Sequence, residues 1–325
     1  MYKKIMVPTD GSGFDRDAIL VALRVAERND AKVRLVRVLT AGALFGMAGS
    51  PDGVGASVEA IRAEHDAALS ELYALAVECR CISSAEIGVD LEQGPVADAL
   101  ERYAKRNEID LIVISSHGRR GIARLSLGSV TDSLIRGTTI PVLIVKPKAS
   151  YLTPDASKEF HHIVVPLDGS TLAEQILTRV IPLAKLEDAE ITLLHVLEPS
   201  EANYSDEERR RLPWWEKGVA GARAYLARKA EQVRRRGIDT TIDVVVGEKV
   251  SDAITDYARR ERADLIAIAT HGRGGLARVL RGSVADAVTK SAMSSVLVFH
   301  PDMAVEKNLS TEAIEKARES EAAFA

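Results

Sequence analysis

The sequence lacks several features that mark particular classes of protein. Its 325 residues include only two cysteines, Cys79 and Cys81, and two thiols one residue apart cannot supply the four ligands of a structural zinc site. No apolar run approaches the length of a membrane span, and residues 1–5 lack the apolar stretch of a signal peptide. The net charge of −4 gives no basic field for nucleic acid. We therefore predict a cytoplasmic protein with reduced thiols that contacts neither membranes nor nucleic acid.

The sequence also lacks the signatures of efficient catalysis. There is no G-x-x-x-x-G-K-[ST] run, so the lysine and hydroxyl of a P-loop nucleoside triphosphatase are missing. There is no G-x-G-x-x-G fingerprint after the first apolar run and no G-x-S-x-G nucleophile elbow. We predict no catalytic residue, and we expect any hydrolysis to be slow.

The sequence does contain a set of short motifs that occurs twice. A His-Gly pair, nine intervening residues and a Gly-Ser pair occur at 117–129 and again at 271–283. The run V-P-T-D-G-S at 7–12 likewise returns as V-P-L-D-G-S at 165–170. The copies of the early motif are 158 residues apart and those of the later motif 154. A spacing held twice indicates that one folding unit was duplicated.

In each half, short runs rich in Val, Ile and Leu alternate with longer segments of helical period, which predicts parallel strands covered by helices. The first helix is predicted to follow Ser12, with Asp15 completing a capping box. Its apolar face comprises Ala18, Ile19, Ala22, Leu23 and Ala26. The predicted strands cover residues 5–9, 33–39, 87–91, 111–115, 142–145, 163–167, 191–196, 241–245, 265–269 and 296–299.

Segments that break this rhythm mark boundaries. The stretch from about 147 to 159 has no apolar period, so we predict a first domain over 1–148 and a second over 159–301, followed by a charged C-terminal tail over 302–325. Insertions at 40–57 and 198–218 are predicted to be mobile covers or contact loops. The fold class is therefore α/β, with two doubly wound, Rossmann-like domains in tandem.

The repeated motifs fall where such sheets bind ligands, beyond the carboxyl ends of the strands at the reversal of winding. Asp10 follows the first strand, and residues 115–118 follow the fourth. The Gly128-Ser129 pair opens a helix whose free N–H groups favour an anion. Glycines at the loop would let the backbone approach phosphate oxygens, while Asp10 could accept bonds from ribose hydroxyls or a base edge. The arrangement suits a nucleotide, and the repeat predicts a second crevice at Asp168.

Each motif also has a purely structural interpretation. Ser129 and Ser283 are followed three residues later by Asp132 and Asp286, the signature of a helix N-cap that needs no ligand. The Asp-Gly-Ser runs could be simple turns, because Asp and Gly are favoured there. Both interpretations stay open at this point.

These residues resemble the universal stress protein family in its tandem form. The resemblance rests on the two V-P-x-D-G-S runs, the S-S-H-G and A-T-H-G loops before G-S-V, and the closing strands at 141–145 and 295–299. It covers nearly the whole chain except the tail. It implies a five-stranded parallel sheet in each half with strand order 3-2-1-4-5. It also implies pairing through the last strand of each sheet, here as an internal pseudo-dimer, which would cover an apolar edge.

The resemblance further implies a nucleotide site in each half, because ATP-binding members hold the nucleotide with G-x-x-G, nine residues and G-[ST]. The first glycine of that pattern is Ser115 in one half and Ala269 in the other, and each adds a Cβ near the ligand and disfavours a positive φ. Carried over, the first site comprises Pro8, Thr9, Asp10, Val38, Ile114, Ser115, Gly118, Gly128, Ser129 and Val130. The second comprises Pro166, Leu167, Asp168, Val196, Ile268, Ala269, Gly272, Gly282, Ser283 and Val284.

Two functions follow from these expectations. The first is an ATP-binding stress-response sensor or regulator that holds an adenine nucleotide, with or without Mg²⁺, in one or both halves and acts at most as a slow ATPase. The alternative is a nucleotide-free stress protein that works through protein contacts, as other members of the family bind no ATP. An ATP-using enzyme such as a nucleotidyl transferase would need a paired His motif and a Ser-Gly-Gly loop, which the sequence lacks. A homo-oligomer beyond the internal pair is left open.

Overall fold

The computed structural model describes residues 2–40, 58–116, 127–146, 159–198, 213–270 and 283–301. The first half contains β1 (Lys4–Pro8), α1 (Arg16–Asn29), β2 (Lys32–Leu39), α3 (Val58–Ile82), β3 (Glu86–Gln93), α4 (Val96–Arg106), β4 (Leu111–Ser115), α5 (Ser129–Gly137) and β5 (Val142–Val145). The second half contains β6 (His162–Pro166), α6 (Thr171–Glu174), α7 (Leu177–Glu187), β7 (Glu190–Leu197), α9 (Pro213–Arg234), β8 (Thr240–Val246), α10 (Val250–Arg260), β9 (Leu265–Ala269), α11 (Ser283–Ser291) and β10 (Ser295–Phe299).

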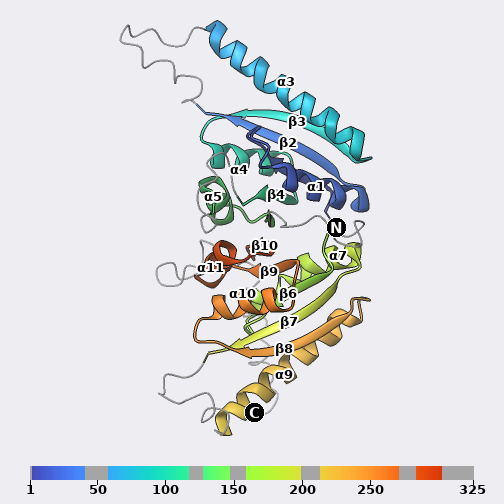
Figure 1. Cartoon of the computed structure of the whole chain (residues 1–325), viewed down its shortest axis with the longest axis vertical. Coiled ribbons are helices and arrows are strands. Elements are labelled where there is room, and N and C mark those ends of the chain that lie inside the picture. Colours follow the sequence, from blue (N-terminus) through green and yellow to red (C-terminus); the bar gives the residue numbers. More distant parts are fainter. Residues whose placement is uncertain are drawn as a thin grey trace, which may run out of the picture.

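The strands form one continuous sheet that runs through both halves (Figure 1) in the order β3-β2-β1-β4-β5-β10-β9-β6-β7-β8. Neighbouring strands within each half are parallel, so each half has the predicted order 3-2-1-4-5. The halves join where β5 pairs antiparallel with β10, with Leu143 opposite Leu297. This confirms the predicted fold class and the internal pseudo-dimer, and all the predicted strands form within two residues of their expected bounds.

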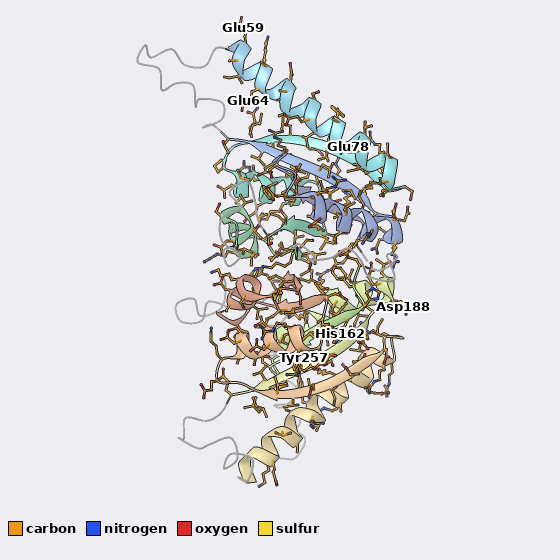
Figure 2. The ribbon with its side chains drawn as sticks, in the orientation of Figure 1. Glu59, Glu64, Glu78, His162, Asp188 and Tyr257 are labelled. Atoms are coloured by element: carbon orange, nitrogen blue, oxygen red, sulfur yellow. The ribbon has the colours of Figure 1, made fainter. Side chains whose placement is uncertain are left out.

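The core lies on both faces of the sheet because its strands are buried on both sides. Ile5 and Val7 of β1 point to a cluster formed with α1, α3, α7 and α9. Met6, between them, points to the opposite cluster, formed with α4, α5, α10 and α11. Side chains fill the space between the helices and the sheet (Figure 2). Each cluster contains residues from both halves, so the two repeats share their core.

The duplication is also visible in the backbone. Asp30 ends α1 with φ +50°, and Asp188, labelled in Figure 2, ends α7 with φ +49°. Glu108 and Arg262, after α4 and α10, both have φ +53°. The first pair is 158 residues apart and the second 154, the same separations as those of the sequence motifs. The left-handed conformation, which non-glycine residues rarely adopt, is therefore repeated at matching positions.

Two local predictions are wrong. Asp15 does not complete a capping box, because α1 begins at Arg16 and Asp15 precedes it without a side-chain capping bond. Its buried carboxylate instead accepts a hydrogen bond from Thr9 Oγ1. The second insertion is also shorter than predicted, since residues 213–218 belong to α9. The remaining insertion residues 41–57 and 199–212, the linker residues 147–158 and the tail 302–325 lie outside the described residues.

Candidate functional site

The reversal of winding lies between β1 and β4 in the first half and between β6 and β9 in the second. β1 and β4 are paired in parallel, so their carboxyl ends lie side by side at one edge of the sheet. Asp10 and Ser115 therefore both lie at the carboxyl ends of these two neighbouring strands. The pairing of β6 with β9 does the same for Asp168 and Ala269. This is the position at which open α/β sheets bind ligands.

The aspartate after the first strand of each half forms a tight turn. Asp10 Oδ1 and Asp168 Oδ1 each accept a hydrogen bond at 2.8 Å from the backbone N–H two residues later. The glycines between have φ +73° at Gly11 and +92° at Gly169, which favours glycine. The turn interpretation is thus confirmed, and the turn fixes each carboxylate at the strand end.

The start of α5 is tied to the end of β4. The Gly128 N–H donates to the Ser116 carbonyl at 3.3 Å, and Thr131 Oγ1 donates to the Ser115 carbonyl at 3.4 Å. Gly128 has an ordinary φ of −60°. A Cβ added there would lie 3.8 Å from Thr131 Oγ1 and 3.9 Å from Ser116 O, which are ordinary contacts. Neither the backbone nor the packing of the described residues requires glycine at this position.

Ser129 does not act as a helix cap. It is the first residue of α5, the preceding N-cap position is Gly128, and no side chain caps the helix. Asp132, the acid of the supposed capping box, binds Arg136 instead, with both carboxylate oxygens 2.6 Å from one guanidinium nitrogen. The cap interpretation is therefore wrong for Ser129, whose exposed side chain lies at the free N–H groups of the helix. Ser283 begins α11 in the same way, but its side chain lies outside the described residues.

Aliphatic side chains line the same end of each half. Val38 and Val130 are half-buried against the cluster shared by α4 and α5, as are Val196 and Val284 against the matching part of the second half. Ile114 and Ile268 are buried in this cluster, whereas Leu167 is buried in the cluster on the opposite face of the sheet. Thr9 is also buried, and Pro8 and Pro166 are half-buried at the strand ends. The carboxyl edge of each half-sheet thus combines an apolar side, a carboxylate and a helix start.

Ser115 and Ala269 disfavour a positive φ, but the backbone does not need a positive φ at either residue. Both residues end buried strands, and neither has a positive φ. Extended backbone suits any residue, so the missing glycine imposes no strain there. Gly118, Gly272 and Gly282 lie outside the described residues, so their placement stays a prediction.

The two candidate sites differ in the residues next to the Asp-Gly turn. In the first half Arg37 forms an ion pair with Glu71, and a Cβ added at Gly11 would lie 3.2 Å from the Arg37 Nη1 atom. The matching positions of the second half hold His195 and Tyr225, whose rings meet edge to face with centroids 6.5 Å apart. The Tyr225 hydroxyl donates to Glu174 at 3.0 Å, and burial together with this acid raises the pKa of Tyr225 above its usual range. The two halves are therefore not chemically equivalent.

Comparison with known proteins decides the family. The model of the universal stress protein family matches residues 1–146 and 159–300. The chain belongs to this family. A universal stress protein of Methanocaldococcus jannaschii is 31% identical over 146 residues, covering 45% of this chain and 83% of that protein. A universal stress protein of Mycolicibacterium smegmatis is 24% identical over 298 residues, covering 91% and 97%.

Solved universal stress proteins share the fold of this chain. The crystal structure of one from Archaeoglobus fulgidus has 16% sequence identity and a TM-score of 0.66, and the match covers 91% of this chain and 98% of that one. Among the described residues of this universal stress protein, no group of three or more His, Cys, Asp or Glu side chains is arranged to hold a metal ion. None of its described helices is long and apolar enough to cross a membrane.

Sequence reasoning missed Lys146 and His300 in this universal stress protein. Each directly follows the last strand of its half and is buried at the junction, with exposed fractions of 9% and 8%. The two are 154 residues apart, which is the separation of the later motifs. This equivalence of position was the only available signal, because the two residue types differ.

Proposed function

We propose that this universal stress protein binds ATP or a related adenine nucleotide at the carboxyl edge of one or both half-sheets, and that it acts as a stress-response sensor or regulator through changes in its loops or its association. The supporting observation is Gly128. Neither the φ of Gly128 nor its described neighbours require glycine there. The missing side chain therefore leaves space for a ligand at the start of a helix. Free backbone N–H groups and the positive end of the helix dipole favour phosphate there.

The surrounding residues fit the parts of a nucleotide. Ser129, at the start of α5, would donate its hydroxyl to a phosphate oxygen, which is worth about 1.5–3 kcal/mol for a charged partner. Val38 and Val130 would provide an apolar contact for the base, and the Asp10 carboxylate would accept bonds from the ribose. A Mg²⁺ ion commonly binds through substrate phosphates and water with few protein carboxylates, so it would accompany the nucleotide.

Binding rather than turnover is the expected role. Fast phosphoryl transfer needs a positioned base or water-orienting residue and cations that stabilise the transition state. The sequence supplies no motif for these groups, so we expect slow hydrolysis at most. A nucleotide-free protein that works through protein contacts is the alternative, favoured by the Cβ atoms of Ser115 and Ala269 where ATP-binding members carry glycine.

The proposal is tested by isothermal titration of the purified full chain with ATP, together with anion-exchange chromatography of the supernatant after denaturation. We expect adenine nucleotide in the extract, and Gly128→Val should weaken or remove one class of site by at least about tenfold, or roughly 1.4 kcal/mol. Its fold should persist because the added Cβ meets only ordinary contacts. Gly218→Ala, with no neighbour within 4 Å of the added Cβ, is the control and should bind as the native chain does.

Two results would contradict the proposal: the first refutes nucleotide binding, and the second refutes a site at the start of α5. One is an empty extract combined with no gain in heat stability at millimolar ATP, since a ligand that binds the folded state must stabilise it. The other is native affinity in Gly128→Val, which would mean that the phosphates do not lie at this helix. Rapid release of phosphate in a timed incubation would instead contradict the expected slow hydrolysis.

A further inference from the structure

The residue after the last strand of each half reaches into the other half. Lys146 follows β5, and its Nζ donates to the carbonyl of Thr289 in α11 at 3.0 Å. His300 follows β10, and its Nε2 contacts the carbonyl of Ile135 in α5. Lys146 and His300 are 154 residues apart, and so are Ile135 and Thr289. One contact is therefore made twice, in opposite directions, across the junction of the halves.

These contacts satisfy helix ends. The last four carbonyls of an α-helix have no partner within the helix. In α5 the Thr138 N–H reaches the Leu134 carbonyl, and in α11 the Ala292 N–H reaches the Val288 carbonyl. The next carbonyl in each helix, that of Ile135 or Thr289, receives its donor from the opposite half. Thr289 is buried and Ile135 is half-buried, so losing a donor would leave a shielded carbonyl without this partner, which is costly.

His300 makes a second contact, with a residue adjacent in sequence to the candidate site of the second half. A carbonyl can only accept, so the bond to Ile135 assigns the proton to Nε2, and Nδ1 then accepts from Thr270 Oγ1 at 2.5 Å. Thr270 directly precedes the repeated motif at 271–283. One ring thus joins the end of α5 in the first half to the entrance of the glycine-rich motif in the second.

Both contacted helices begin at the candidate phosphate positions, since α5 starts at Ser129 and α11 at Ser283. Figure 1 shows α5 and α11 on the same side of the sheet, on either side of the β5–β10 junction. We propose that Lys146 and His300 are positioning residues that each hold the phosphate-site helix of the opposite half and thereby set the affinity of the nucleotide site there. This inference rests on the proposed function, because an effect on affinity requires that the sites bind nucleotide.

The first arm of the test needs no nucleotide. Amide hydrogen exchange of the full chain should show lower protection at the end of α11 in Lys146→Met, and at the end of α5 in His300→Leu. Lys146→Arg and His300→Gln keep a donor and should restore most of the protection. Lys290→Met is the matched control, because Lys290 lies on α11 itself in a half-exposed pair with Asp286. Changes confined to the half that carries the substitution would overturn the positioning role.

The second arm measures ATP affinity one site at a time. In a Gly128→Val background, Lys146→Met should weaken binding at the second site by about three- to tenfold. In a Gly282→Val background, His300→Leu should weaken binding at the first site by a similar factor, and the donor-keeping variants should recover it. Unchanged affinity beside the Lys290→Met control would overturn the effect of these residues on the opposite site. Cross-half exchange effects in a chain that binds no ATP would refute the proposed function and retain only the positioning of the helices.

Discussion

At the scale of single residues, His300 links the stability of the fold to pH. The ring is 8% exposed at the junction of the halves, and this burial lowers its pKa from 6.5 to about 4. Its hydrogen bonds to Thr270 and Ile135 use one ring nitrogen as acceptor and the other as donor, which is the neutral form. Protonation would remove the acceptor and place a charge in a buried site.

We predict that this residue makes the protein less stable in mild acid. The unfolded chain binds the proton near pH 6.5 and the folded chain near pH 4, so its contribution is complete above pH 6.5 and is lost as the pH falls toward 4. The loss at pH 4.5 is about 2–3 kcal/mol, at 1.36 kcal/mol for each unit of pKa shift. The free energy of unfolding can be measured by urea titration at pH 7.5 and at pH 4.5. The difference between these two values should be smaller by this amount in His300→Gln than in the native chain. His65→Gln is the control, because the His65 side chain is 42% exposed. Identical pH profiles for His300→Gln and the native chain would contradict the prediction.

The site residues that could be predicted from the sequence are those whose residue type is the same at equivalent positions of the two halves. Asp10 and Asp168 stand in the same short run, and both form the same turn at the same edge of the sheet. Lys146 and His300 occupy equivalent positions and make equivalent contacts, but they are different residue types. A donor to a helix carbonyl can be an ammonium or an imidazole, so a comparison of residue types could not find this pair.

At the scale of the elements, strands were predictable and helix starts less so. A parallel strand buried on both faces is a continuous apolar run, which the sequence displays directly. A helix start depends on which partner a polar side chain finds. Asp15 binds Thr9 and not a backbone N–H at the start of α1, whereas Ser170 does cap α6 by accepting from Ala173 N at 3.1 Å. The local sequence is compatible with a capping or a non-capping side chain, so tertiary contacts decide which of the two forms.

Helix α9 provides a stability prediction at this scale. Gly221 lies inside the helix, is exposed, and has no atom within 4 Å of an added Cβ. Gly221→Ala should therefore raise the free energy of unfolding by about 0.5–1 kcal/mol, because alanine loses less backbone freedom in a helix. Gly169→Ala is the matched contrast and should destabilise, since φ there is +92°. Urea titration of both variants checks the pair, and equal effects of the same sign would contradict it.

At the scale of the whole molecule, the halves form one structure. The β5–β10 pairing continues the sheet across the junction, and the paired residues Leu143 and Leu297 are fully buried. Both hydrophobic clusters draw side chains from the two repeats. The pairing could be expected from the family resemblance, but the shared clusters could not, because a sequence pattern shows which face is apolar and not which half covers it.

A shared core predicts a single cooperative unfolding transition. Both tryptophans, Trp214 and Trp215, belong to the second half of the sequence and the first half has none, so tryptophan fluorescence serves as the probe of the second half. Ile87 lies in β3, at the far end of the sheet, with an exposed fraction of 5%. Ile87→Ala should cost about 2–5 kcal/mol through the cavity it leaves. If the halves unfold together, this loss must lower the midpoint of the tryptophan transition as much as that of the circular dichroism transition. A fluorescence midpoint that stays at its native value while circular dichroism becomes biphasic would mean that the repeats unfold separately despite their common sheet.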